Sequence, residues 1–341
     1  MIRAGKDVNG LKRWLWTALV WLCLSAQVQA ETVQMILSES YPENHPVVRA
    51  EREFAQNVNE RSGGRIQIEL SCSGRLYLEE AAALEGVLHG DVALARVSAT
   101  VCEKLVPEME VFRLPYLFGS GEHYRRVMEG NIGEELLGAI GRSGGGAQAL
   151  CWLDGGAQGW YTTRPLVNLG DLKNRRICTE NPLLKEVLEH LGARTLTGIG
   201  PHSVYSTLAQ GNAEGAEGTA LDYYTRGDYD AAPYYYQDRH LQIPGVLLIS
   251  DRALELLEEQ DAAILLEEAG TLNRRAGELL EETMQAQRAA IEEAGGHFEE
   301  PAPEERSDTA RSLMSGSSSG IGKIRDRQQT LVDRIETENN G

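Results

Sequence analysis

The segment DLKNRRICTENPLL, Asp171–Leu184, decides the fold because it joins a turn, a short strand and a helix. Cys178 stands where the strand should end, directly after two arginines and an isoleucine. Asn181 and Pro182 suit the cap and the first position of a helix. The helix then carries apolar residues at helical spacing, which predict one buried face: Leu183, Leu184, Val187, Leu188 and Leu191.

Similar strand and helix patterns precede and follow this segment. Before it, ETVQMILSES and RIQIEL predict strands, and HPVVRAEREFAQNVNERSGG between them predicts a helix that ends at Gly-Gly. A second α/β unit begins near Gly155, and the stretch from Asp251 to Ala294 is almost entirely helix formers. The alternation predicts an α/β fold in which helices cover sheets.

The composition excludes one class of partner. The chain has 341 residues, long enough for two domains, and a formal net charge of −18. A surface this acidic repels phosphate backbones, so we expect no nucleic-acid binding.

The N-terminus predicts export. Lys12 and Arg13 precede the apolar run Trp14–Ala26, and Val28–Ala30 form a small-residue cleavage site. We therefore assign residues 1–30 to a signal peptide and expect a soluble periplasmic protein. An uncleaved anchor is the alternative, although the run is too short to cross a bilayer comfortably.

The cysteines of the mature chain do not form a recognisable motif. Cys72, Cys102, Cys151 and Cys178 allow three full pairings, and they show no CxxC or Cys/His clustering. We expect no metal site and favour isolated, mostly buried thiols, with the disulfide state left open.

Catalytic signatures are also absent from the sequence. No GxSxG, HExxH or GxGxxG motif is placed between a predicted strand and a following helix, and the histidines are scattered singly. Two α/β units without such a signature suggest a cleft that binds a solute, with no cofactor. An enzyme with Cys178 as nucleophile is the alternative, for which His202 is the only histidine to consider as a base.

Five collinear segments resemble the periplasmic solute-binding proteins of TRAP transporters, the DctP-like family. The resemblance covers roughly residues 33–298. Its segments are HPVVRAEREFAQNVNERSGGRIQIEL, VPEMEVFRLPYLFGSGEHYRRVMEGNIGEELL, RPLVNLGDLKNRRICTENPLLKEVLEHLGA, VYSTLAQGNAEGAEG and HLQIPGVLLIS.

The resemblance implies two α/β lobes with a ligand cleft between them and a long helix that spans both. Lobe I would comprise residues 31–155 plus 242–282, lobe II residues 156–241 plus 283–325, and residues 326–341 a loose C-terminal tail. It further implies a monomer that delivers a small solute to the TRAP permease, a membrane protein driven by an ion gradient.

The departures from the family concern the solute contacts. The arginine that usually pairs with a substrate carboxylate falls on Cys178, and a second one falls on Gln158. A usual asparagine falls on Gly218 and a cleft carboxylate on Ser98. A neutral thiol cannot hold a carboxylate as a guanidinium does. A shifted alignment would instead give the anchoring role to Arg176.

Other candidate site residues have alternative interpretations. Arg96 is either a relocated anchor or a rim charge paired with Glu103. Arg75 lies at the cleft mouth or is simply solvated, and Trp160 stacks on a solute or packs near the hinge. Glu217, if it faces the cleft, favours a cationic or hydroxyl-rich solute.

The resulting prediction is an extracytoplasmic solute-binding subunit of a TRAP-type transporter. Its solute is an organic acid held by displaced arginines, or a neutral or zwitterionic compound held by polar and backbone groups. The alternative is a ligand-sensing or envelope partner protein that keeps the fold without the usual arginine.

Overall fold

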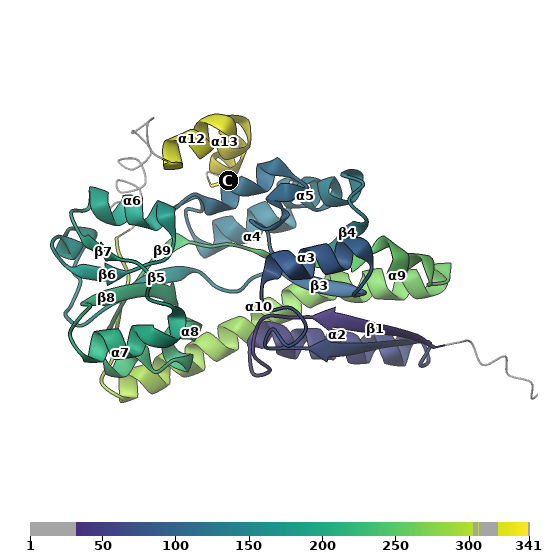
Figure 1. Cartoon of the computed structure of the whole chain (residues 1–341), viewed down its shortest axis with the longest axis horizontal. Helices are drawn as coiled ribbons and strands as arrows, with labels where there is room; N and C mark the ends of the chain where they lie inside the picture. Colours follow the sequence, from purple (N-terminus) through teal and green to yellow (C-terminus); the bar gives the residue numbers. More distant parts are fainter. Residues whose placement is uncertain (1–31, 303–305, 307–319, 340–341) are drawn as a thin grey trace, which may run out of the picture.

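The computed structural model describes residues 32–302, 306 and 320–339. The predicted signal peptide, residues 1–30, lies outside these described residues. The described chain forms two α/β lobes side by side, each built on its own sheet (Figure 1). The predicted fold class is therefore confirmed.

The sheet of lobe I has the strand order β2-β1-β3-β10-β4. β1 runs parallel to β2 and β3, whereas β10 is antiparallel to β3 and β4. The strands are β1 (Val33–Ser38), β2 (Ile66–Ser71), β3 (Leu94–Ser98), β4 (Ala147–Leu153) and β10 (Gly245–Ser250). The helices are α2 (Pro46–Arg61), α3 (Glu80–His89), α4 (Gly121–Glu129), α5 (Asn131–Arg142) and α9 (Asp251–Glu255).

The sheet of lobe II has the strand order β11-β9-β5-β8-β6-β7. β5 is antiparallel to β8 and β9, and β6 is parallel to β7 and β8. The strands are β5 (Gln158–Thr162), β6 (Arg176–Cys178), β7 (Arg194–Leu196), β8 (Gly215–Thr219), β9 (Tyr234–Leu241) and β11 (His297–Glu299). The helices are α6 (Pro182–His190), α7 (Val204–Ala209) and α8 (Ala220–Thr225).

The segment Asp171–Leu184 folds as its sequence predicts. It contains β6 and the start of α6, and the side chain of Asn181 accepts hydrogen bonds from the N–H groups of Leu183 and Leu184. Pro182 is the first helical residue, where its missing N–H costs nothing.

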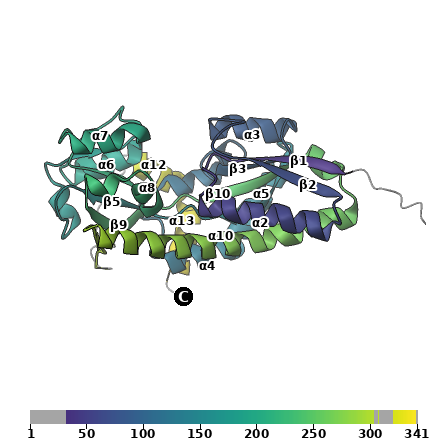
Figure 2. The same ribbon diagram turned by 90° about the horizontal axis from the view of Figure 1, so that it is seen from below.

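Within the described residues, three connections join the lobes. The chain crosses from β4 to β5 and returns from β9 to β10, and α10 (Glu259–Glu293) packs against α2 of lobe I and α8 of lobe II. Figure 2 shows α10 running under both lobes beside α2. Its buried residues recur every three or four positions, as a packed helix requires: Leu265, Ala269, Leu272, Ala276 and Leu279. Among the described helices, none combines the length and apolarity needed to cross a membrane.

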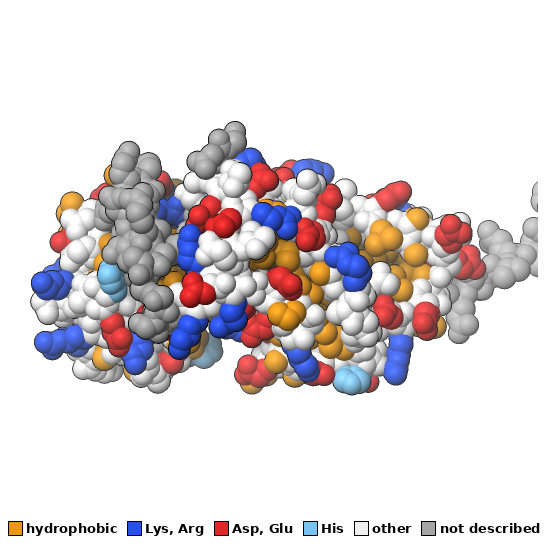
Figure 3. All heavy atoms as spheres, turned by 90° about the horizontal axis from the view of Figure 1, so that it is seen from above, with side chains coloured by type: hydrophobic (Ala, Val, Ile, Leu, Met, Phe, Trp, Pro, Cys, Tyr) orange, Lys and Arg blue, Asp and Glu red, His pale blue; other side chains and the backbone are white. Residues whose placement is uncertain are grey.

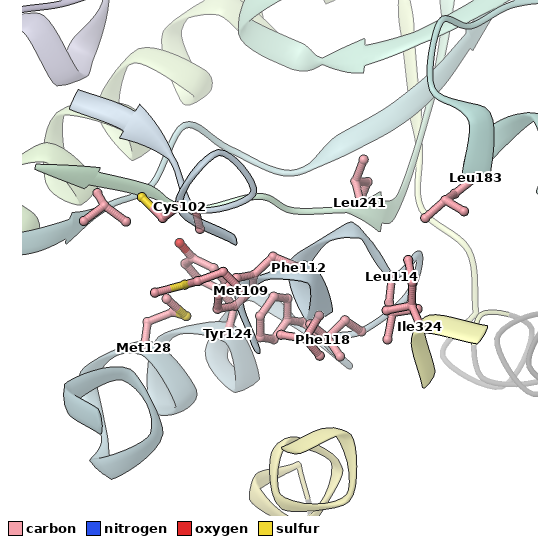
Figure 4. Packing of buried hydrophobic residues seen from close by; sticks show 14 of the residues in the cluster. Cys102, Met109, Phe112, Leu114, Phe118, Tyr124, Met128, Leu183, Leu241 and Ile324 are labelled. Atoms are coloured by element: carbon pink, nitrogen blue, oxygen red, sulfur yellow. The ribbon is translucent and has the colours of Figure 1, made fainter. Parts of the chain in front are cut away.

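The C-terminal helices close a core shared by both lobes. α12 (Gly320–Arg327) contacts α6, and α13 (Gln329–Glu338) contacts α4. Ile324 joins a cluster that includes Leu114 of lobe I and Leu183 of lobe II (Figure 4). The described part of the expected loose tail, residues 326–341, is thus helical. The reason is an apolar stripe that is buried against lobe I: Leu331, Val332 and Ile335.

Candidate functional site

The space between the lobes is bordered by strand ends. The outline of the molecule is indented between the two lobes (Figure 3). Carboxyl ends of parallel strands are where open α/β sheets bind ligands. Tyr41, just after β1, lies against the hinge, because a Cβ atom at Gly155 would be 2.5 Å from its hydroxyl oxygen. Burial raises the pKa of Tyr41 to about 12; Arg96 opposes the increase, and Glu39 and Asp222 of lobe II add to it.

Arg96 forms the centre of the lobe I wall. Its side chain is 3% exposed, and its Nε donates to both oxygens of Glu39 at 2.9 and 2.8 Å. Its Nη2 lies 3.0 Å from Glu80 and donates to the Ser40 hydroxyl at 2.5 Å. The guanidinium also covers the ring of Tyr41 at 4.0 Å. Two carboxylates therefore already neutralise this arginine.

Of the two interpretations of Arg96, the one that pairs it with Glu103 as a rim charge is wrong. Glu103 instead accepts two hydrogen bonds from Arg113, at 2.8 and 2.9 Å. Arg96 meets Glu39 because Ser38, the last residue of β1, pairs with Ala95 of β3, so the next residues of the two segments are neighbours. The amide and hydroxyl of Ser98 both donate to Glu80. Glu80 therefore places a carboxylate beside Ser98, and sequence reasoning missed it.

Two further titratable groups lie buried in lobe I. Glu51 is fully buried, and burial, with the nearby Glu39 carboxylate, raises its pKa well above the ordinary value. His45 stacks on Tyr41 at 3.8 Å, and burial lowers its pKa to about 3. His45 is therefore uncharged near neutral pH, and burial favours the uncharged form of Glu51, so neither group adds positive charge to this part of the wall.

Polar residues of lobe II share one face of its sheet. Gln158 pairs with Thr219 and Trp160 pairs with Glu217 across β5 and β8, so these four side chains point to the same side. The Oε1 atom of Gln158 is buried without a hydrogen-bond partner. Glu217 accepts one long contact, 3.4 Å from the hydroxyl of Thr179, and burial raises its pKa.

Trp160 supports the hinge from within the core. It is fully buried, its Nε1 donates to Asp238 at 2.9 Å, and its ring stacks on His240 at 4.1 Å. Asp238 also accepts from the hydroxyl of Tyr116 in lobe I at 2.6 Å. Of the two predicted roles for Trp160, packing near the hinge is the one its contacts match.

Cys178 belongs to the opposite face of the same sheet. It pairs with Ala216 and clusters with Tyr161 and Tyr223 in the core of lobe II. Burial raises its pKa to about 11, so the thiol is protonated at neutral pH. All four cysteines of the described chain are free and buried, which confirms the prediction of isolated thiols and excludes a Cys72–Cys178 bridge in this structure.

Arg226 occupies the side-chain space above Gly218. A Cβ atom at Gly218 would lie 3.0 Å from its Nη2, which also donates to Tyr161 at 3.2 Å. Its Nε donates to the fully buried Asp228 at 3.0 Å. Sequence reasoning missed this arginine, because only the fold brings the end of α8 over β8.

The two remaining arginines lie away from these side chains. Arg176, at the amino end of β6, donates to the carbonyls of Gly211 and Asn212, both at 2.9 Å. Arg75 is two-thirds exposed and pairs with the exposed Glu43 at 3.0 Å.

A cavity of about 610 Å³ lies elsewhere, between α4, α10 and the hinge. Its lining includes Tyr124, Arg125, Asp154 and Arg239, but none of the predicted site residues. We place the candidate site at the strand ends, where chain topology concentrates ligand contacts. No cluster of three side chains able to bind a metal occurs within the described ranges.

Comparisons with known proteins agree with this architecture. The family of bacterial extracellular solute-binding proteins, family 7 (DctP), matches residues 37–315. A solute-binding protein of Chromohalobacter salexigens is 28% identical over 257 residues, 75% of each chain. The uncharacterized protein YiiZ of Salmonella typhimurium is 31% identical over 236 residues, 68% of this chain and 71% of its own.

Solved structures give the same result. A TRAP periplasmic solute-binding protein from Pseudomonas putida F1 with bound D-glucuronate has a TM-score of 0.75 at 25% identity, covering 89% of this chain and 96% of its own. One from Bradyrhizobium sp. BTAi1, in complex with α/β-D-galacturonate, has a TM-score of 0.72 at 26% identity, covering 89% and 99%.

The family match and the two-lobed fold identify a transporter solute-binding protein, a class of proteins that bind substrates and are not enzymes. The chain belongs to the bacterial extracellular solute-binding proteins of family 7, which serve TRAP transporters.

Proposed function

We propose that this extracytoplasmic binding protein captures a small polar solute without the arginine–carboxylate pair that the resemblance implies for lobe II. The N-terminal segment directs it to the periplasm, where it acts as a monomer. After closure of the lobes, it delivers the solute to a TRAP permease.

The unpaired acceptors of lobe II carry this proposal. Gln158 leaves a buried oxygen without a donor, and Glu217 places a carboxylate on the same face with one long contact. Arg96 across the cleft is already neutralised by Glu39 and Glu80. A solute carboxylate would therefore meet acceptors without a free cation, and such burial costs several kcal/mol.

A thermal-shift screen of residues 31–341 tests the charge class of the solute. The screen compares related solutes that carry a carboxylate, a hydroxyl or an amine, beginning with D-glucuronate, D-glucose and D-glucosamine. A ligand at 100 times its Kd adds about 2.7 kcal/mol to the stability. We expect shifts only from hydroxyl or amine members; a shift confined to carboxylates overturns the proposal.

A uronate is the second candidate, favoured by Arg226. Its guanidinium stands where a side chain at Gly218 would lie, and relatives at 25–26% identity hold uronates. Under this alternative, Arg226→Gln abolishes the shift caused by D-glucuronate, whereas the exposed Arg194→Gln leaves it unchanged.

Delivery is tested by uptake. Cells that express the candidate permease should accumulate the labelled hit only when the binding protein is also present. A protein that binds the hit but supports no uptake would act as a sensor instead.

A further inference from the structure

Three hydrogen-bond acceptors of lobe II surround Trp160 without adequate donors. Gln158 Oε1 and His240 Nε2 are buried and have no partner within the described chain. The carboxylate of Glu217 has only the 3.4 Å contact from Thr179. Buried polar atoms are nearly always paired in folded proteins, so two unpaired atoms beside a weakly held carboxylate indicate a missing partner.

Asp238 fixes the tautomer of His240. Its Nδ1 lies 2.8 Å from Asp238, a fully buried carboxylate that can only accept, so Nδ1 carries the proton. Tyr116 and Trp160 hold the second oxygen of Asp238 in place. When the ring is neutral, Nε2 therefore presents a lone pair.

The three acceptors lie within side-chain reach of one another. Glu217 is the direct cross-strand partner of Trp160, and such pairs have Cβ atoms about 5 Å apart. His240 stacks on the indole at 4.1 Å, and Gln158 precedes Trp160 by two residues on the same face.

We propose that Gln158 Oε1, Glu217 and His240 Nε2 form a subsite for a primary ammonium group of the solute. The inference rests on the proposed function and names its substrate class: an amine such as an amino sugar or an amino acid. A primary ammonium has three N–H donors for the three acceptors, and Glu217 supplies the opposite charge. A hydroxyl offers one donor, a quaternary ammonium none, and a carboxylate only further acceptors.

A fragment titration tests the subsite apart from the rest of the solute. Protein labelled with ¹⁵N-histidine is titrated to about 100 mM with ethylammonium, and the His240 Nε2 resonance is assigned with His240→Gln. A fragment of three heavy atoms binds no tighter than about 1 mM by the usual efficiency ceiling. We expect a saturable shift of this resonance with ethylammonium, and none with tetramethylammonium or acetate.

Matched variants on β8 complete the test. Glu217→Gln removes the charge at the subsite and should weaken ethylammonium binding about 10-fold or more. Glu214, which directly precedes β8 and pairs with Arg164, provides the control. Glu214→Gln also removes one carboxylate charge, but it should change ethylammonium binding less than about 2-fold. Melting temperatures show that both variants fold.

The outcomes separate this inference from the proposed function. No saturable shift, an equal shift with tetramethylammonium, or equal effects of both variants overturns the ammonium subsite. In those cases, a neutral hydroxyl-bearing hit in the thermal-shift screen would still support the proposed function. A screen that gives only carboxylate hits overturns the proposed function itself.

Discussion

The two walls of the cleft treat their polar atoms differently. In lobe I, the polar groups around Arg96 satisfy one another, because Arg96 binds Glu39 and Glu80 and Ser98 donates twice to Glu80; of this part of the described chain, the nearby Glu51 keeps both carboxylate oxygens without a partner. In lobe II, Gln158 and His240 each leave a buried atom without a partner. A self-paired wall fixes shape, whereas an unpaired wall selects what completes it. We therefore infer that solute selectivity resides mainly in lobe II.

The largest expected effect comes from restoring an arginine to lobe II. Cys178 lies in a core with Tyr161 and Tyr223, so Cys178→Arg would bury a cation and overfill the space. An unpaired buried charge costs about 3–5 kcal/mol and overpacking about 1–3 more. We expect the free energy of unfolding, measured in urea, to fall by nearly the sum of these two costs. We expect no gain of carboxylate binding.

Cys178→Ala is the matched control and should cost about 1 kcal/mol. A stable Cys178→Arg protein that binds uronates would show that the side chain at 178 reaches the cleft after all.

The second largest effect is expected in lobe I, on the free energy of unfolding. Arg96→Met leaves the buried Glu39 carboxylate without its cation, which costs about 3–5 kcal/mol. The exposed Arg75→Met should change the free energy of unfolding by less than about 0.5 kcal/mol. Equal stabilities of the two variants, measured by urea unfolding, would contradict a structural role for Arg96.

An alkaline titration tests the burial of the Cys178 thiol. Its folded pKa of about 11 exceeds the ordinary 9.0, so its contribution to stability is complete below pH 9 and is lost as pH rises toward 11. The stability difference between wild type and Cys178→Ala should fall by up to about 1.4 kcal/mol per pH unit in this window. A constant difference would mean that the thiolate is solvated.

The smallest effect concerns Glu217 and the stability of lobe II. Burial raises its pKa, so ionisation of Glu217 destabilises the fold as pH rises through the folded pKa. Glu217→Gln should therefore stabilise the ligand-free protein at pH 7 by about 1 kcal/mol, the usual gain when a functional strain is removed. The gain should vanish below pH 4, where both states protonate the acid. A loss of stability at pH 7 would indicate a cation partner.

The sequence predicts the fold well because its signals are local. The Asn181 cap, the strand ending at Cys178 and the long run of helix formers each depend on neighbours along the chain. The site is predicted less well because its contacts are not local. Glu39 lies 57 residues from Arg96, so no local pattern announces their ion pair.

Lobe II illustrates the same limit. Gln158 and Glu217 are predictable as site candidates from aligned segments, but their shared face depends on the β5–β8 register. His240 and Arg226 escape sequence reasoning, because only tertiary packing brings His240 to Trp160 and Arg226 to Gly218.

A crystal structure of the mature protein with the hit of the thermal-shift screen tests the central claim most directly. We predict an ammonium group of the solute within hydrogen-bond distance of Gln158 Oε1, Glu217 and His240 Nε2. A solute carboxylate paired with Arg96 or Arg226, with Gln158 and Glu217 still lacking donors, would contradict the account.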